Sequence, residues 1–332
     1  MLKLPVTYLL KGATLPTTRT DQPHVLMCGP YPAWDMEPLE AGYALHKLWE
    51  AADREALLLA CAPQVRAVAT RGELGANAEL IGRLPALQII SCYGVGTDAI
   101  DLAAARARGI RVTNTPDVLT GDVADIAVGL ALAAMRRIPA GDAHVRSGAW
   151  AQKNMDLVTR LYGKRVGLVG FGRIGTTVAK RLSGFDVELG YFDQAARSDS
   201  THRFFGSLTD LAEWCDLLIV TLAGGVATHG MVGADVLRAL GPEGWLVNVS
   251  RGSTVHEPAL LDALENHQIA GAGLDVFWNE PRIDSRFMAL DNVVLQPHHA
   301  SGTIETRRAM GQLVRDNLAA HFAGRPLLTP VV

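Results

Sequence analysis

The chain has 332 residues, of which 48% are hydrophobic and 20% are charged, and its formal net charge is −3. This composition is typical of a globular protein and excludes disordered and collagen-like chains, while the length favours about two domains. No run of Lys or Arg is long enough to follow a phosphate backbone, so we expect no nucleic-acid partner. The longest apolar stretch, Ala124 to Met135, is too short to cross a bilayer and contains Asp125, so we expect no membrane partner.

The cysteine pattern and the opening residues indicate a cytoplasmic protein. The four cysteines are widely spaced and form no C-x-x-C pair: Cys28, Cys61, Cys92 and Cys215. This spacing argues against a disulfide framework and a zinc knuckle, and it fits a reducing cytoplasm. The opening "MLKLPVTYLLKGATLP" is broken by Pro5 and stopped by Lys11, which is too little for a secretory signal, so we interpret it as a first strand. The histidines lack the spacing of a metal site, and we predict none.

The first third of the chain alternates strand and helix patterns, which is typical of βαβ units and a parallel sheet. "LQIIS" over 87–91 and "IRVTNT" over 110–115 read as strands, with a glycine-terminated helix over 100–109 between them. A long helix begins near Thr120, a plausible N-cap, and runs to about Arg137. We expect this helix to cross between two domains.

A second series from Lys164 predicts six strands in a doubly wound sheet: "KRVGLVG", "DVELGYF", "DLLIV", "GWLVNVS", "AGAGLDVF" and "NVVLQP". Within it, Ser207 followed by Asp210 predicts the start of a helix. The stretch "TIETRRAMGQLVRDNLAAHFAG" has apolar residues at helical spacing and ends at Gly324. We expect it to form a helix that packs back on the first domain.

The stretch "VGFGRIG" places Gly170, Gly172 and Gly175 after an apolar strand and at the start of a helix. These glycines allow a tight turn, a close approach of pyrophosphate to backbone amides, and close strand–helix packing. Asp193 ends the next strand 18 residues after Gly175, where a carboxylate can accept hydrogen bonds from ribose hydroxyls. The pattern predicts a dinucleotide site, and the alternative is a glycine-rich turn with a chance acid.

The same loop bears on the choice of dinucleotide. The carboxylate of Asp193 repels a 2′-phosphate, and Gln194 follows it rather than an Arg that could pair with that phosphate. NAD(H) is therefore favoured over NADP(H). Arg197, three residues beyond Gln194, could compensate in part, so dual use stays open.

Three polar residues follow three predicted strands: Arg251, Glu280 and His298. Taken singly, they could be a surface loop residue, a solvated turn residue and a capping histidine. Open α/β sheets bind ligands at the carboxyl ends of their strands, however, and these three groups have complementary chemistry. Together, behind a nucleotide fold, they predict a proton-transfer set.

Hydride transfer to a 2-oxo acid would use this set. Arg251 can hold a planar carboxylate bidentately and polarise the adjacent carbonyl. His298 can donate a proton to the developing alkoxide, and Glu280 at the far ring nitrogen would fix the tautomer and favour the imidazolium. His299 would point the other way in an extended segment, and we assign it no chemistry.

From about residue 65 onward the sequence resembles the D-isomer-specific 2-hydroxyacid dehydrogenase family, above all its hydroxypyruvate/glyoxylate reductase and hydroxyphenylpyruvate reductase branch. The motifs that carry the resemblance occur in this order: "SCYGVGTDAIDL", "GIRVTNTPDVLTGDVADIAVGLALA", "GLVGFGRIG", "NVSRG", "GAGLDVFWNEP", "LQPHHASGT" and "LLTPVV". The resemblance implies a Rossmann-type doubly wound parallel-sheet domain at 117–299, which binds dinucleotide. It is inserted in a smaller flavodoxin-like α/β substrate-binding domain at 1–116 and 300–332. It also implies a homodimer.

The resemblance implies roles for individual residues as well. The catalytic residues fall on Arg251, Glu280 and His298, and Asp275 matches the position that contacts the nicotinamide carboxamide. The substrate would be held by Arg251, His298 and the loop Tyr93, Gly94, Val95 and Gly96, whose backbone amides bind its carboxylate. Cofactor contacts are expected at Gly170, Gly172, Arg173, Ile174, Gly175, Asp193, Thr221, Leu222, Ser250, Asp275 and Ser301.

Comparison with the family at three positions refines the expected cofactor, substrate loop and activity. Many relatives have a small polar residue followed by Arg where this chain has Asp193-Gln194, which weakens the case for NADP. Many also have Ser where this chain has Gly94, which makes the substrate loop less predictable. Formate dehydrogenases of the family use Gln where this chain has Glu280, which speaks against that activity.

The sequence thus predicts an NAD(P)H-dependent reductase of small 2-oxo acids, of the glyoxylate, hydroxypyruvate or arylpyruvate type, that makes D-2-hydroxy acids. The alternative is a dinucleotide-sensing scaffold, since some proteins of this fold act as corepressors. Selectivity for the side chain of the substrate would depend on loops near Arg71 and Tyr93, and on the partner subunit. The sequence leaves the physiological 2-oxo acid open.

Overall fold

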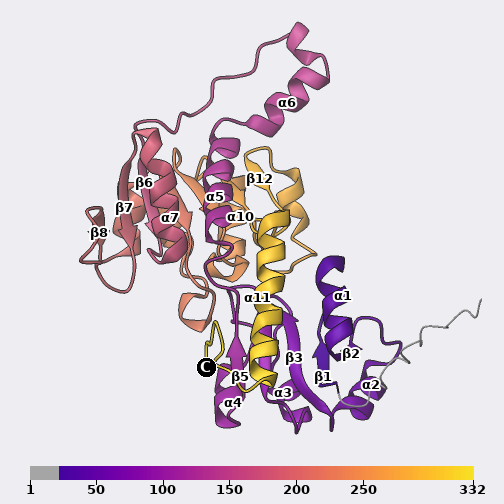
Figure 1. The fold of residues 1–332 in the computed structure, drawn as a ribbon. Helices are drawn as coiled ribbons and strands as arrows, with labels where there is room; N and C mark the ends of the chain where they lie inside the picture. Colours follow the sequence, from indigo (N-terminus) through magenta and orange to yellow (C-terminus); the bar gives the residue numbers. More distant parts are fainter. Residues whose placement is uncertain (1–21) are drawn as a thin grey trace, which may run out of the picture.

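The computed structural model describes residues 22–332, which form two lobes, each built on its own parallel sheet (Figure 1). The stretch interpreted as a first strand lies outside the described residues. This architecture confirms the predicted fold class, a Rossmann-type sheet combined with a smaller α/β unit.

The smaller lobe contains a five-stranded sheet with the order β2-β1-β3-β4-β5, which is the flavodoxin-like order. Its strands are β1 (His24–Met27), β2 (Ala44–Lys47), β3 (Val65–Arg71), β4 (Ile89–Tyr93) and β5 (Arg111–Thr113). The helices between them are α1 (Ala33–Gly42), α2 (Arg54–Cys61), α3 (Ala78–Arg83) and α4 (Leu102–Ala107). The two strands predicted in this region correspond to β4 and β5, and the helix predicted between them to α4.

The larger lobe contains a seven-stranded parallel sheet with the order β12-β11-β10-β9-β6-β7-β8. Its strands are β6 (Arg165–Val169), β7 (Glu188–Phe192), β8 (Arg203–Phe205), β9 (Leu217–Val220), β10 (Trp245–Asn248), β11 (Gly271–Leu274) and β12 (Val293–Leu295). Its helices include α7 (Arg173–Leu182), α8 (Leu208–Trp214), α9 (Ala234–Leu240) and α10 (Glu257–Glu265). The prediction of six strands is wrong by one, because β8 has only three residues and too little sequence to show a period.

Two helices join the lobes. α5 (Thr120–Met135) follows β5 and packs on α7, β10 and β11, whereas α11 (Ile304–Phe322) follows β12 and returns to β4 and α1. The predicted boundaries at 116/117 and 299/300 fall in the two connections that precede these helices. We propose that the two domains meet at these two boundaries.

The helix starts show where local signals succeed. Ser207 caps α8 by accepting a hydrogen bond from the backbone amide of Asp210 at 3.3 Å, as predicted. The predicted cap at Thr120 is wrong by one residue. Thr120 is the first helical residue of α5, and Leu119 occupies the N-cap position without a side-chain hydrogen bond.

A helical arm projects from the larger lobe between α5 and β6 and carries α6 (Ile138–Arg146) (Figure 1). Large apolar side chains are exposed along it: Ile138, Val145, Trp150, Leu157 and Tyr162. None of the residues of α6 is buried. α6 therefore contributes no buried side chain to the core, whereas Leu161, at the end of the arm, is 3% exposed and packs into it.

One edge of the five-stranded sheet is covered by the segment 329–332. The backbone amide of Val112 in β5 donates to the carbonyl of Val332 at 3.1 Å, and that of Val331 donates to the carbonyl of Val112 at 2.7 Å. Thr329 is fixed on the other side by the buried Asn317 of α11, which donates to the Thr329 hydroxyl at 2.9 Å. Residues 329–332 thus pair with β5 although they follow α11 in the chain.

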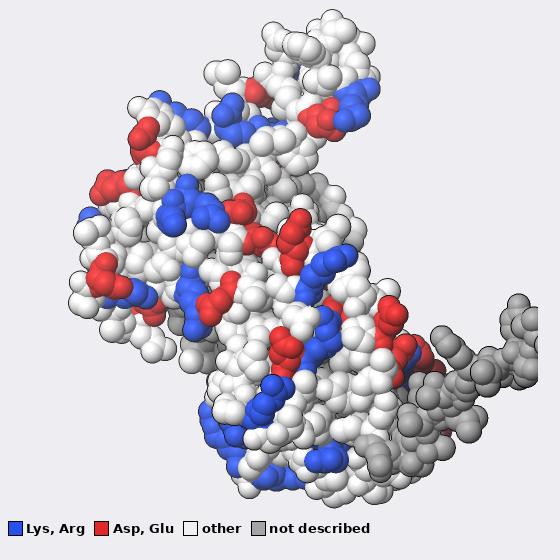
Figure 2. Space-filling model, in the orientation of Figure 1, with Lys and Arg blue, Asp and Glu red and all other residues white. Residues whose placement is uncertain are grey.

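Charged side chains of both signs are mixed over most of the face drawn in Figure 2. None of the helices between residues 22 and 332 combines the length and apolar character needed to span a membrane.

Candidate active site

A cavity of about 1130 Å³ is lined by residues from both lobes. The smaller lobe contributes the loop after β4, and the larger lobe contributes the segments after β10, β11 and β12. Several predicted site residues line it: Tyr93, Gly94, Val95, Gly96, Leu222, Arg251, Asp275, Glu280, His298 and Ser301. The carboxyl ends of strands from two sheets therefore meet in one cavity, as expected for α/β folds.

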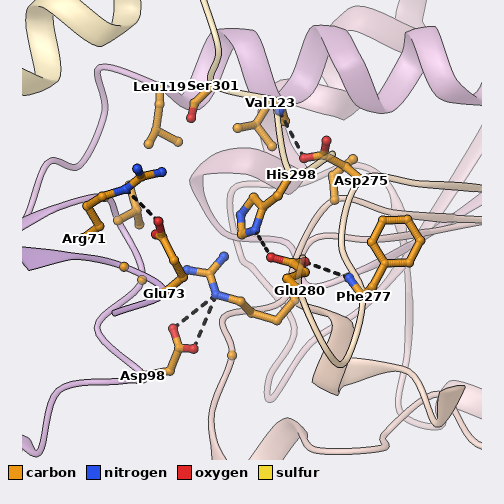
Figure 3. A pocket seen from close by; sticks show the side chains of 18 of the residues that line it. Arg71, Glu73, Asp98, Leu119, Val123, Asp275, Phe277, Glu280, His298 and Ser301 are labelled. Atoms are coloured by element: carbon orange, nitrogen blue, oxygen red, sulfur yellow. Dashed lines mark hydrogen bonds and ion pairs between the residues drawn. The ribbon is translucent and has the colours of Figure 1, made fainter. Parts of the chain in front are cut away.

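His298 and Glu280 form a hydrogen-bonded pair that faces this cavity (Figure 3). The distance from His298 Nδ1 to Glu280 Oε2 is 2.6 Å, and the other oxygen of Glu280 accepts the backbone amide of Phe277 at 2.8 Å. Burial acts to raise the pKa of Glu280, but the hydrogen bonds from His298 and Phe277 outweigh it and hold that pKa below its usual value. The carboxylate is therefore ionised at neutral pH and can accept a proton from Nδ1, which leaves Nε2 as the ring nitrogen without a partner among residues 22–332.

Asp275 holds the backbone of the histidine segment. Its carboxylate, 1% exposed, accepts the amides of His299 at 2.7 Å and Ala300 at 3.1 Å, and its carbonyl accepts the amide of His298 at 2.8 Å. His298 adopts a φ of 50°, in the left-handed region that is uncommon outside glycine. Burial raises the pKa of Asp275, although the two amides oppose the shift. Three hydrogen bonds thus maintain the backbone geometry that directs the His298 ring.

His299 is excluded from the cavity lining. Its side chain is exposed and lies against Gly302, where a Cβ would overlap the imidazole. The two adjacent histidines therefore have different surroundings, but the predicted reason is wrong, because the segment is not extended and His298 has a φ of 50°.

Arg251 follows β10 and reaches across to the smaller lobe. Its Nε lies 3.3 and 3.4 Å from the two carboxylate oxygens of Asp98, and its Nη1 donates to the carbonyl of Ser250 at 2.8 Å. Both side chains of the Arg251–Asp98 pair are 25% exposed. Arg251 is thus held from two sides before any ligand binds.

The loop after β4 presents unpaired backbone donors. The amides of Val95 and Gly96 donate to no acceptor among residues 22–332. Tyr93 anchors the start of this loop, since its hydroxyl donates to the carbonyl of Arg307 in α11 at 2.6 Å. Burial raises the pKa of Tyr93 to about 12, so it stays a neutral phenol. Amides of this kind can bind an anion.

The glycine-rich turn between β6 and α7 has the geometry of a pyrophosphate site. Gly170 has a φ of 93°, which favours glycine, and a Cβ at Gly175 would overlap the Gly170 carbonyl. Gly172 is the N-cap of α7, has no side-chain cap, and has open space on its Cα. The first amides of α7 are therefore accessible to a negatively charged group, and the turn fits a dinucleotide.

The family model of the D-isomer specific 2-hydroxyacid dehydrogenase NAD-binding domain matches residues 128–300. The chain is also 45% identical to a hydroxyphenylpyruvate reductase from Plectranthus scutellarioides, over 93% of this chain and 98% of that protein. The chain belongs to the D-isomer specific 2-hydroxyacid dehydrogenase family.

Solved structures of this dehydrogenase family have the same fold. A 2-hydroxyacid dehydrogenase from Ketogulonicigenium vulgare Y25 is 56% identical with a TM-score of 0.88, covering 94% of this chain and 98% of that one. An NADPH-dependent glyoxylate/hydroxypyruvate reductase from Sinorhizobium meliloti, solved with NADP and malonate, is 43% identical with a TM-score of 0.88, covering 94% and 97%.

At the end of β7, the carboxylate predicted to bind the adenosine ribose already accepts hydrogen bonds from the protein. Asp193 accepts the backbone amide of Phe171 through Oδ2 and that of Gln194 through Oδ1, both at 2.7 Å. Arg197, the residue that could compensate for its charge, is paired with Asp199, with Nη2–Oδ2 at 2.6 Å and Nε–Oδ1 at 2.9 Å. In this dehydrogenase the guanidinium of Arg197 is therefore already paired with the carboxylate of Asp199.

Other predicted cofactor residues of the dehydrogenase lie outside the cavity lining: Gly170, Gly172, Arg173, Ile174, Gly175, Asp193, Thr221 and Ser250. They gather at the β6–α7 turn and the ends of β7, β9 and β10. Among residues 22–332, no group of three or more His, Cys, Asp or Glu side chains could hold a metal ion.

Sequence reasoning missed Asp98 and the Arg71–Glu73 pair as charged groups of the cavity. Arg71 had been assigned only a general role in selectivity, and its Nε lies 2.6 Å from Glu73 Oε1. Asp98 stands in the motif "SCYGVGTDAIDL", two residues after Gly96. Its position next to the substrate loop was the available signal.

Proposed function

We propose that this enzyme is an NAD(P)H-dependent reductase of small 2-oxo acids that yields D-2-hydroxy acids, with His298 as the acid. The observation that carries the proposal is the Glu280–His298 pair, at 2.6 Å, in a cavity that also contains Arg251. A histidine with one nitrogen fixed by a carboxylate and the other facing a cavity is suited to proton transfer.

The substrate would be held by its carboxylate. The unpaired amides of Val95 and Gly96 and the guanidinium of Arg251 supply donors on the same side of the cavity. Arg251 would also polarise the 2-oxo group, and His298 Nε2 would give its proton to that oxygen. Glu280, ionised beside Nδ1, would stabilise the imidazolium before transfer.

The cofactor would occupy the glycine-rich turn, with Gly170, Gly172 and the first amides of α7 around the pyrophosphate and Asp193 at the adenosine ribose. When bound, the reduced nicotinamide would supply the hydride. Thr221, Leu222, Ser250, Asp275 and Ser301 would lie along the rest of the cofactor. NADH is proposed to be preferred, because Asp193 repels a 2′-phosphate and Arg197 is occupied by Asp199.

A panel of substrates tests this function directly. Glyoxylate, hydroxypyruvate and phenylpyruvate are each assayed with NADH and with NADPH. The products of hydroxypyruvate and phenylpyruvate are separated on a chiral column, since glycolate, the product of glyoxylate, has no stereocentre. We expect reduced cofactor to be consumed and the D enantiomer to form from the two chiral cases. Tight dinucleotide binding without turnover of any of these acids would contradict the proposal and favour the scaffold role.

We also propose that the enzyme is located in the cytoplasm. Fractionation of the producing cells tests this location.

The projecting arm supports a homodimer as the working unit. Leu157 is 102% exposed and Trp150 is 63% exposed, and apolar surface of this kind is usually covered by a partner. Much of the arm on the face drawn in Figure 2 is uncharged. Light scattering coupled to gel filtration should give the mass of two chains, and Leu157→Asp should shift the mass toward one chain. A monomeric wild type would contradict this proposal.

A further inference from the structure

The ion pair between Arg251 and Asp98 connects the two lobes at the cavity. Asp98, labelled in Figure 3, lies in the loop after β4 of the smaller lobe. Arg251 follows β10 of the larger lobe. Their side chains are both 25% exposed, and both residues line the cavity. A partly buried pair at such a place fixes geometry more than a surface pair does.

Glycines of both lobes make room for this pair. A Cβ at Gly96 would overlap Arg251 Nη2, and a Cβ at Gly224 would lie 2.7 Å from Arg251 Cγ and 3.2 Å from Asp98 Cγ. Neither glycine has a φ in the left-handed region, so their backbone conformations do not require glycine. The absence of side chains at Gly96 and Gly224 is therefore explained by the space that Arg251 and Asp98 occupy.

The hydrogen bonds of Arg251 leave Nη2 as the guanidinium nitrogen with no protein partner among residues 22–332. Nε faces Asp98 and Nη1 donates to the Ser250 carbonyl, whereas Nη2 has no acceptor among residues 22–332. Nη2 lies over Gly96, next to the unpaired amides of the substrate loop. With Asp98 in place, Arg251 therefore directs Nη2 toward the loop, while Nη1 keeps one N–H beyond its bond to the Ser250 carbonyl.

We propose that Asp98 is a positioning residue that orients Arg251 so that Nη2 meets the substrate at the Val95–Gly96 loop. This inference rests on the proposed function. The charge of Asp98 weakens the binding of an anionic substrate, because it reduces the attraction of Arg251 for an anion. The same carboxylate favours catalysis, because its oxygens set the direction of the guanidinium. Removal of the carboxylate should therefore lower kcat without weakening the binding of an anion at the substrate site.

The test uses Asp98→Asn and Asp98→Ala in the full-length enzyme, with glyoxylate and NADH. We expect kcat to fall by up to about 10²-fold, the usual cost of a misplaced group, with the smaller loss in the Asn variant, which keeps one oxygen. The inhibition constant of oxalate, a competing dicarboxylate, should stay the same or decrease. The dissociation constant of NADH should not change. Asp235→Asn, which removes the charge of an exposed ion pair with Arg238, is the matched control.

The outcomes separate this inference from the proposed function. A loss of kcat with unchanged or tighter oxalate binding supports the positioning role. An unchanged kcat, or a loss of kcat accompanied by weaker oxalate and NADH binding, overturns it, since the second result means that Asp98 only maintains the fold. If the wild type itself reduces no 2-oxo acid, the proposed function fails instead. Thermal melting identifies a variant that does not fold, and then the Asn variant decides.

Discussion

The hydrogen bond between Glu280 and His298 assigns different tasks to the two ring nitrogens. Nδ1 faces the carboxylate of Glu280, so in the proposed mechanism Nε2 is the nitrogen that gives its proton to the substrate. His299, by contrast, has an exposed ring outside the cavity. Two adjacent residues of the same type can therefore be told apart by experiment.

His298→Ala should lower kcat by roughly 10²–10⁴-fold, the usual contribution of a positioned acid. The affinity for NADH should be nearly unchanged, because the glycine-rich turn lies elsewhere. Steady-state kinetics and a fluorescence titration with NADH measure the two quantities. His299→Ala is the matched control and should keep most of the activity, so an equal loss in both variants would mean that His298 is not the acid.

Glu280→Gln should lower kcat and remove the acid limit that titration of Glu280 gives to the reduction reaction. Burial acts to raise the pKa of Glu280, but the hydrogen bonds from His298 and Phe277 hold it below its usual value, so the ionised carboxylate at His298 Nδ1 persists until the pH falls through that lowered pKa. An amide does not titrate in this range, so the variant should be less active without a further loss of kcat on the acid side. A kcat profile that starts below the usual carboxyl pKa and runs to neutral pH checks this, and the same acid limit in both enzymes would contradict it.

The preference for NADH should depend on Asp199 as well as on Asp193. We expect kcat/KM for NADH to exceed that for NADPH by roughly 10-fold, which corresponds to ~1.4 kcal/mol. Asp199→Ala should narrow the ratio because it releases Arg197 for the 2′-phosphate, and Asp193→Ser with Gln194→Arg should reverse it. Asp235→Ala serves as the control. A wild type that prefers NADPH would contradict our interpretation of this loop.

At the scale of elements, α1 and α11 are joined by a buried charge. Asp35 of α1 is 0% exposed and pairs with Arg315 of α11, directly over Gly311. Burial raises the pKa of Asp35, although Arg315 opposes the shift. Since α11 also holds Tyr93 through Arg307, this contact supports the start of the loop 93–96, which we propose binds the substrate.

Gly311→Ala should destabilise the enzyme, because the added Cβ would overlap the Asp35 carboxylate. Overpacking of this kind costs roughly 1–3 kcal/mol. Gly82→Ala in α3, where nothing lies within 4 Å of the added atom, should leave stability unchanged or raise it by up to ~1 kcal/mol. Urea unfolding followed by circular dichroism measures both, and equal stability of the two variants would contradict the prediction.

The elements differ in how far the sequence predicts them. Strands with long apolar runs, such as β6 and β9, were predicted, as were α4, α5 and α11. β1 and β2 have four residues each and contain a histidine, and β8 has three, so none shows a clear period. Tertiary pairing rather than local preference forms these short strands.

Across the whole molecule, the sequence predicts the site residues that directly follow strands. It does not predict the contacts that form only when the two lobes pack together. Arg251, Glu280 and His298 each follow a strand, so topology alone places them near one another. The Arg251–Asp98 pair joins residues 153 positions apart in different lobes, and the Arg197–Asp199 pair depends on side-chain conformation. No pattern in one sequence reports either contact.

The segment 329–332 has a consequence for solubility. β5 is the last strand of its sheet, and an uncovered strand edge can pair with the same edge of another molecule and start aggregation. The hydrogen bonds of Val331 and Val332 to Val112 satisfy that edge from within the chain. A variant without residues 330–332 should therefore scatter more light during refolding, whereas Val331→Ala, which keeps the backbone bonds, should not. We therefore expect the segment 329–332 to keep concentrated enzyme from associating through the edge of β5.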